Sequence, residues 1–138
     1  MLKGWKYSQR RPNVKVQCDK EFGCVYAVKI KVLSGHLVKI GATREPNVRL
    51  TGFASSYATI FCVSPQHLNF FENEEILHNH FAKYRVPAKP GHRVQPELFN
   101  ISLSYFFKNL PELKYITDIQ DADIREDMTY GRFYFAKK

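Results

Sequence analysis

Glu74 is the residue whose type and position most clearly suggest chemistry. Residues 69–86 carry apolar side chains at helical spacing, and four of them form one stripe: Phe70, Leu77, Phe81 and Tyr84. At about 100° per residue, Glu74 falls about 40° from Phe70, inside this stripe, whereas Glu75 falls about 140° away. A carboxylate on an apolar face is costly unless it pairs with a cation or holds a metal ion. The pattern leaves both alternatives open, a structural ion pair and a metal site.

Two histidines follow Glu74 on the same predicted helix. His78 lies one turn further on, at the edge of the apolar stripe, within reach of Glu74 or of a substrate. A single histidine at such a place is more often packed than catalytic. His80 faces another direction, because residues i and i+2 do not share a helix face. The two histidines are therefore a poor metal clamp.

Two predicted strands precede this helix and carry residues that a plain hairpin does not need. Residues 24–33 are rich in β-branched side chains, and residues 36–41 resume the strand pattern after a turn. Tyr26 lies near the start of the first strand, and Lys39-Ile40-Gly41 ends the second. Neither is required by turn or strand chemistry, so a functional reason is expected for both.

The remaining predicted elements complete a small mixed domain. They are a short helix within 43–52, a strand at 58–64, a helix at 101–110, an acidic loop or irregular helix at 111–127 and a late strand at 129–136. Hairpin-joined strands followed by helices are typical of an α/β fold of the mixed α+β type, rather than of a doubly wound sheet. The sequence therefore predicts a small three-stranded antiparallel sheet flanked by helices.

Charge indicates a polyanionic partner. The chain has 138 residues and a formal net charge of +8. We expect a basic N-terminal arm at 1–21, a domain at 22–110, and at 111–138 an acidic segment and a strand that pack on the same domain. The bases of the arm that we expect to contact such a partner, most often nucleic acid, are Lys3, Lys6, Arg10 and Arg11.

Neither a membrane nor a secreted protein is predicted. The sequence has no apolar run near the roughly 20 residues that a membrane helix needs. The basic N-terminus has no apolar core of the kind found in secretory signals. We expect an intracellular protein, in the cytoplasm or a host cell. Its oligomeric state is open, with a homodimer as one option.

These motifs together resemble the GIY-YIG nuclease superfamily. The resemblance covers about residues 22–107 and rests on an ordered set: Cys24-Val25-Tyr26, Lys39-Ile40-Gly41 with Thr43, Arg49-Leu50, the helical stretch "ENEEILHNHF" and "ELFN". The set is most similar to a branch found in phages, large DNA viruses and some cellular proteins, whose second tripeptide is commonly "KIG". Two residues depart from the name-giving motifs, since Lys39 replaces a tyrosine and Cys24 a glycine.

The resemblance implies a DNA endonuclease that hydrolyses a phosphodiester with one Mg²⁺ or Mn²⁺ ion. It assigns the metal to Glu74 as the single protein carboxylate. Tyr26 would act as a general base, or position one, and would need a lowered pKa to do so. Arg49 would stabilise charge on the phosphate in the transition state. Lys39 would bind phosphate or orient water, and His78 completes the expected catalytic set.

Further residues are weaker candidates on the same resemblance. Asn100 follows "LF" where the family has an asparagine, and Tyr57 and His67 are candidates for an additional His or Tyr after the arginine. Arg44, near the site, is expected to hold the DNA backbone. The alternative to an enzyme is a catalytically inactive protein of this fold that binds DNA or a protein as an accessory factor. Metal-dependent nicking of a plasmid separates the two.

Overall fold

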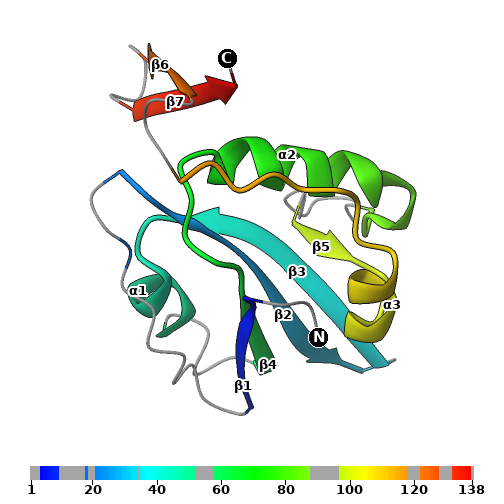
Figure 1. The fold of residues 1–138 in the computed structure, drawn as a ribbon. Coiled ribbons are helices and arrows are strands. Elements are labelled where there is room, and N and C mark those ends of the chain that lie inside the picture. The colour runs from blue at the N-terminus through cyan, green and yellow to red at the C-terminus, as the bar shows by residue number, and fades with distance from the viewer. Residues whose placement is uncertain are drawn as a thin grey trace.

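The structure is a computed structural model that describes residues 4–9, 18, 21–33, 35–51, 58–87, 97–117, 122–127 and 132–137. Its elements are β1 (Lys6–Gln9), β2 (Cys24–Val32), β3 (Gly35–Thr43), α1 (Pro46–Thr51), β4 (Ala58–Val63), α2 (Phe70–His80), the 3-10 turn η1 (Ala82–Tyr84), β5 (Leu98–Phe99), α3 (Leu103–Lys108), β6 (Ala122–Asp127) and β7 (Arg132–Lys137). Figure 1 shows α2 lying across the main sheet. None of the helices in these ranges has the length and apolarity of a membrane span.

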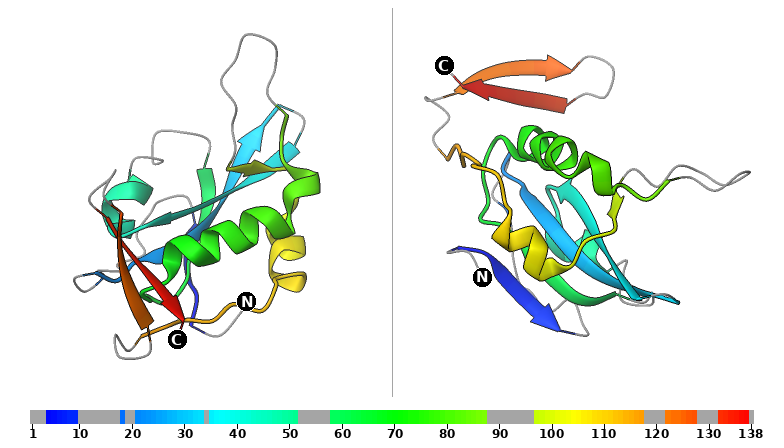
Figure 2. Two further views of the ribbon diagram at one scale, coloured as in Figure 1. Left: turned by 90° about the horizontal axis from the view of Figure 1, so that it is seen from above. Right: turned by 90° about the vertical axis from the view of Figure 1, so that its right-hand side faces the viewer.

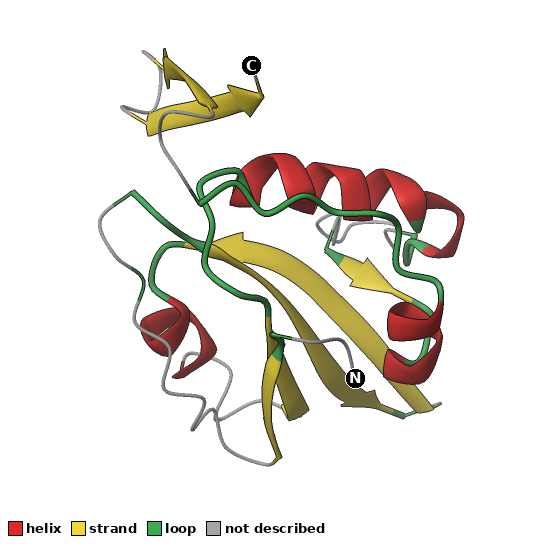
Figure 3. Ribbon diagram, in the orientation of Figure 1, coloured by secondary structure: helices red, strands yellow, loops and turns green. Residues whose placement is uncertain are grey.

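The main sheet is antiparallel and has the strand order β1-β4-β2-β3-β5 in the described part of the chain. The mixed α+β class is confirmed, and the three predicted strands are β2, β3 and β4 (Figure 3). β1 and β5 extend the sheet on both sides, so within the described residues it has five strands rather than the three predicted. These edge strands have four and two residues, so they depend on their neighbours and have little pattern of their own.

Several elements differ from their predicted bounds or type, among them β3, α2 and β6. β3 continues past Gly41 to Thr43. α2 ends at His80, and the rest of the predicted helix contains only the tighter 3-10 turn, in which the Arg85 N–H donates to the Ala82 carbonyl. Residues 122–127, expected to be a loop or irregular helix, instead form β6 and pair with β7, a late strand. Backbone pairing with the next strand along the chain, rather than the side-chain pattern of residues 122–127 themselves, decides that last case.

Alternate residues of β2 are buried on opposite faces of the sheet. Val25 and Ala27 belong to the cluster that packs beneath α2, together with residues of β3. Tyr26 and Val28 belong to a second cluster on the other face. This alternation follows from strand geometry, in which successive side chains point to opposite sides. Figure 2 shows α2 nearly end-on above one face, so Tyr26 lies on the side away from α2.

Part of the predicted N-terminal arm belongs to the folded core. Trp5 is 7% exposed and contacts the rings of Phe106 and Phe107 edge-on, with centroids 6.0 and 5.3 Å away. Its indole N–H donates to the Tyr115 hydroxyl at 3.2 Å. The next four residues form β1 and pair with β4. Residues 5–9 are therefore fixed to the sheet rather than extended from it.

Buried amides attach the segment 111–117 to α2. Asn69 donates from Nδ2 to the Lys114 carbonyl at 2.7 Å and accepts from the Ile116 N–H at 2.9 Å. Asn73, one turn later, donates to the same Lys114 carbonyl at 3.0 Å. Both asparagines are almost completely buried. The helix thus fixes a chain segment that the apolar pattern of the sequence does not connect with it.

Candidate active site

The register of β2 and β3 explains why Tyr26 and Gly41 occur together. The two residues are directly opposite each other across the strand pair. A Cβ atom on residue 41 would lie 2.9 Å from Tyr26 Cε2, and closer still to Cζ and the hydroxyl oxygen. Gly41 is therefore needed for space, because the tyrosine ring lies over its backbone. The ring is 1% exposed, so it has little room to move.

The short helix α1 brings Arg49 to the Tyr26 hydroxyl. Pro46 occupies the first helical position, which suits its fixed φ and missing N–H. The Thr43 hydroxyl accepts from the Glu45 N–H at 3.0 Å, and the Glu45 carbonyl accepts from the Arg49 N–H at 2.9 Å. Arg49 Nε then donates to the Tyr26 hydroxyl oxygen at 3.2 Å. The end of β3 thus fixes where α1 begins, and α1 in turn fixes the position of the Arg49 guanidinium.

The protonation of Tyr26 depends on its surroundings. Burial raises the pKa of Tyr26 above its usual value, and this outweighs the opposing effect of the hydrogen bond from Arg49. The carboxylates of Glu97 and Glu74 raise it further. The pKa of Tyr26 is therefore raised in the protein without a bound cation, and the lowered pKa that a general base needs beside a metal ion stays a prediction. Tyr26 is a neutral phenol here, able to donate a hydrogen bond while it accepts one from Arg49.

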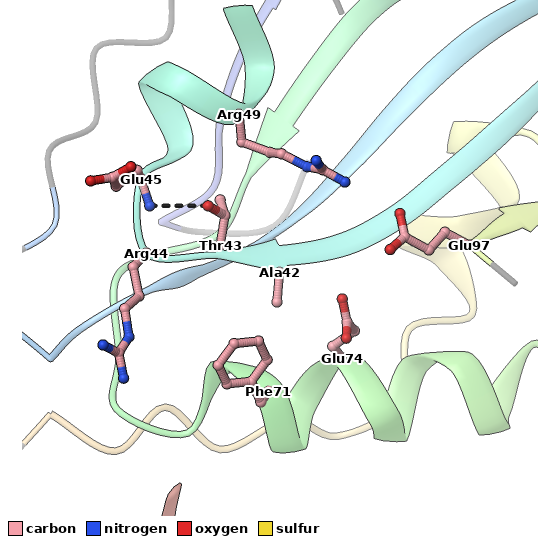
Figure 4. A pocket seen from close by; sticks show the side chains of 8 residues that line it. All are labelled: Ala42, Thr43, Arg44, Glu45, Arg49, Phe71, Glu74 and Glu97. Carbon is pink, nitrogen blue, oxygen red and sulfur yellow. Dashed lines mark hydrogen bonds between the residues drawn. The ribbon is translucent and has the colours of Figure 1, made fainter. Parts of the chain in front are cut away.

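A cavity of about 590 Å³ lies beside the end of β3. Its lining comes from β3, the turn between β3 and α1, α1, α2 and the residue before β5: Ala42, Thr43, Arg44, Glu45, Arg49, Phe71, Glu74 and Glu97. Figure 4 shows Arg49 on one side of β3 and Glu74 rising from α2 on the other. Glu74 is half-buried, whereas Glu75 is exposed. The expectation that Glu74 faces the sheet is confirmed, and its role as a metal ligand stays a prediction.

Glu97 is a pocket residue that sequence reasoning missed. Its carbonyl accepts from the Ile40 N–H at 2.8 Å, which fixes it beside β3. Its Oε2 lies 3.5 Å from Lys39 Nζ. Figure 4 shows its carboxylate directed toward the same space as that of Glu74. The two acids are 23 positions apart in the sequence, which is not a recognised spacing. The motif "ELFN" was the available signal for Glu97, but it pointed only to Asn100.

The other expected catalytic residue, His78, does not line this pocket. Its Nε2 donates to the Ile40 carbonyl at 2.8 Å, and its ring contacts Phe99. The structure thus places His78 between α2 and β3, where it links the helix to the backbone next to Gly41. Lys39 lies on the same strand and pairs with Glu97, outside the pocket lining itself.

Of the described weaker candidates, His67 and Asn100 do not line the pocket, whereas Arg44 does. His67 is completely buried, donates from Nδ1 to the Pro65 carbonyl at 2.8 Å and accepts from Asn73 at 3.1 Å. Asn100 is exposed and does not line the pocket. Arg44 is exposed and does line it.

The expected DNA contacts of the arm are mostly outside the described residues. Lys3, Arg10 and Arg11 lie there, and so does Tyr57. Lys6 is exposed on β1.

The pocket fits a hydrated divalent cation better than a fully protein-coordinated one. Among the described residues, no three His, Cys, Asp or Glu side chains come together as a metal site. Glu74 and Glu97 offer two carboxylates, and Glu97 Oε2 is a buried oxygen that accepts no hydrogen bond. Mg²⁺ keeps several waters and binds through one or two carboxylates together with phosphate oxygens. The donor set present matches that preference.

The family follows from comparison with known proteins. The model of the T5orf172 domain matches residues 23–114, which is two thirds of the 138-residue chain. The chain belongs to this family, a phage-associated domain of the GIY-YIG-like nuclease fold group, which indicates a nuclease-like or DNA-binding function. Comparison with curated proteins and with solved structures found no match.

Proposed function

We propose that this protein is a Mg²⁺- or Mn²⁺-dependent endonuclease that hydrolyses a phosphodiester bond of DNA. One observation carries the proposal: Arg49 on α1 and Glu74 on α2 line one pocket, and the hydroxyl of the buried Tyr26 on β2 fixes the Arg49 guanidinium from behind. A phenol, a guanidinium and a carboxylate beside a water-accessible cavity are the groups that metal-assisted phosphodiester hydrolysis needs. The T5orf172 family supports the same class of function.

Arg49 would stabilise the negative charge that develops on the phosphate oxygens. Its Nε is engaged by Tyr26, and this bond fixes the plane of the guanidinium. A preoriented donor costs no reorganisation during the reaction, so it stabilises the transition state more than the ground state. Glu74 would hold the cation at the opposite side of β3. When bound, Mg²⁺ supplies a Lewis acid that polarises a phosphate oxygen and lowers the pKa of a water.

Tyr26 would orient the attacking water rather than remove its proton in the resting protein. Its raised pKa keeps it neutral, and a neutral phenol positions water by hydrogen bonding. Two of the groups that raise this pKa are Glu97 and Glu74. Neutralising those carboxylates would remove their contribution, but burial, the largest cause, would still raise the pKa. A general-base role would therefore also need the direct effect of the cation's own charge on the phenol.

DNA would be held by basic side chains near the pocket and across the surface. Arg44 lines the cavity and is exposed, and Lys6 is exposed on β1. The formal net charge of +8 favours association with a polyanion. Affinity for DNA should accordingly fall steeply as salt concentration rises.

A second candidate function is DNA or protein binding without catalysis. The raised pKa of Tyr26 favours it, because a buried neutral phenol is a poor base. Such a protein would keep the fold and the basic surface and would bind DNA equally well with or without a cation. Cleavage, and not binding, therefore separates the two candidates.

The test is cleavage of supercoiled plasmid and of labelled linear, branched and single-stranded DNA. Reactions contain Mg²⁺, Mn²⁺ or a chelator, and affinity is measured separately in Ca²⁺. Wild type should cut only with Mg²⁺ or Mn²⁺. Glu74→Gln should abolish cleavage, whereas Glu75→Gln, an exposed neighbour on the same helix, should leave it near wild type. Binding without cleavage of any substrate would refute the enzyme and leave the accessory protein.

A further inference from the structure

Glu97 holds a fixed position at the mouth of the pocket. β5 pairs with β3 at Val38 and Lys39, and the Glu97 carbonyl accepts the next hydrogen bond, from Ile40. Beyond that point, no described strand pairs with this edge of β3. The Glu97 side chain therefore projects where the sheet edge opens into the cavity. The hydrogen bond from Ile40 and the β5 pairing that follows fix the backbone from Glu97 onward beside β3.

One oxygen of the Glu97 carboxylate lacks a hydrogen bond, although the side chain as a whole is 31% exposed. Oε2 is buried, accepts no hydrogen bond and meets the Lys39 ammonium only at 3.5 Å. A buried carboxylate oxygen without hydrogen bonds is an uncommon and costly arrangement, and it calls for a partner. The space beside it is the cavity that Glu74 also lines (Figure 4).

We propose that Glu97 is a second carboxylate ligand of the divalent cation in this pocket, and that it exchanges the Lys39 ammonium for the cation. This inference rests on the proposed function and deepens it. Two carboxylates balance the charge of a divalent ion and leave the remaining positions to water and phosphate, as Mg²⁺ prefers. Lys39, once its carboxylate partner turns toward the cation, presents its charge to the DNA phosphate.

The exchange predicts opposite effects of two substitutions on cation affinity. Removing the Glu97 charge takes away a ligand, so the cation should bind more weakly. Removing the Lys39 charge frees Glu97 from its competitor and removes a nearby positive charge, so the cation should bind more tightly. If Glu97 served only as the ion-pair partner of Lys39, Glu97→Gln would remove no ligand, and only the smaller through-space effect of a nearby charge would remain.

The experiment measures Mn²⁺ binding by the full chain without DNA, from the electron paramagnetic resonance signal of free Mn²⁺. Glu97→Gln should weaken binding by about tenfold, the scale for loss of one supporting carboxylate. Lys39→Met should tighten it by about threefold. Glu45→Gln is the matched control, because it removes the same charge from the same pocket lining but its carboxylate points away from Glu74 and Glu97 in Figure 4. Its affinity should equal that of wild type.

Each outcome decides the inference. Unchanged affinity in Glu97→Gln overturns it, and so does equal weakening by Glu45→Gln, which would indicate general electrostatics. Wild type that takes up no Mn²⁺ at millimolar concentration overturns it as well. If Glu97→Gln fails to fold by circular dichroism, the Lys39→Met measurement decides alone, and unchanged affinity there overturns the exchange. Because no DNA is present, failure here is distinct from failure of the proposed function, which plasmid cleavage decides.

Discussion

Replacing Gly41 by alanine tests the contact that organises the candidate site. The added Cβ would lie 2.9 Å from Tyr26 Cε2 and nearer to two other atoms of the phenol. Carbon atoms in contact prefer about 3.5–4.0 Å, so the ring must retreat by roughly 1 Å. Tyr26 is 1% exposed and lies in a packed cluster, so the retreat creates overpacking that costs about 1–3 kcal/mol. The shift also breaks the hydrogen bond from Arg49, which adds about 1 kcal/mol.

The expected loss in unfolding free energy is therefore about 2–4 kcal/mol, the sum of these two contributions. Urea unfolding followed by the fluorescence of Trp5, the single tryptophan, measures it. The control is the same substitution in a Tyr26→Leu background, where the phenol atoms that meet the new Cβ are gone. Gly41→Ala should then cost much less. If the stability costs of the two single substitutions add up to that of the double variant within about 0.5 kcal/mol, the Tyr26 ring is not the reason that residue 41 must be glycine.

Two further predictions concern His67, which precedes α2, and His78, which lies on α2. Burial lowers the pKa of His67 to about 4 from 6.5. Between these two pH values the unfolded chain binds a proton that the folded protein does not. The free energy of unfolding should therefore fall by about 3 kcal/mol as pH drops from about 6.5 to 4. Urea midpoints across this range measure the loss, and His67→Gln should flatten the profile. His78→Gln keeps a donor for the Ile40 carbonyl and should cut DNA at a rate near wild type, whereas His78→Ala should lose about 1 kcal/mol of stability. A hundredfold slower His78→Gln in single-turnover cleavage would show that His78 takes part in the chemistry.

The elements that the sequence predicted correctly are those with a long local pattern. β2 and α2 have nine and eleven residues, and each shows its period in the sequence. β1 and β5 were missed because a strand of four or two residues has no period, and its hydrogen bonds come entirely from a neighbour. The acidic strand β6 was taken for a loop or helix for the same reason, since its partner β7 defines it.

For the candidate site, the sequence alone determined the features that depend on neighbouring positions in the chain. The helical period sets which side of α2 carries Glu74, and the strand motifs pointed to Tyr26 and Gly41 before their register was known. Only tertiary structure could show that Tyr26 is buried against Gly41, which raises its pKa rather than lowering it. It alone could bring Glu97 beside Lys39, 58 positions earlier in the chain. Burial and charge act through space, and neither the desolvation of a phenol nor the approach of a distant carboxylate leaves a periodic trace in the sequence.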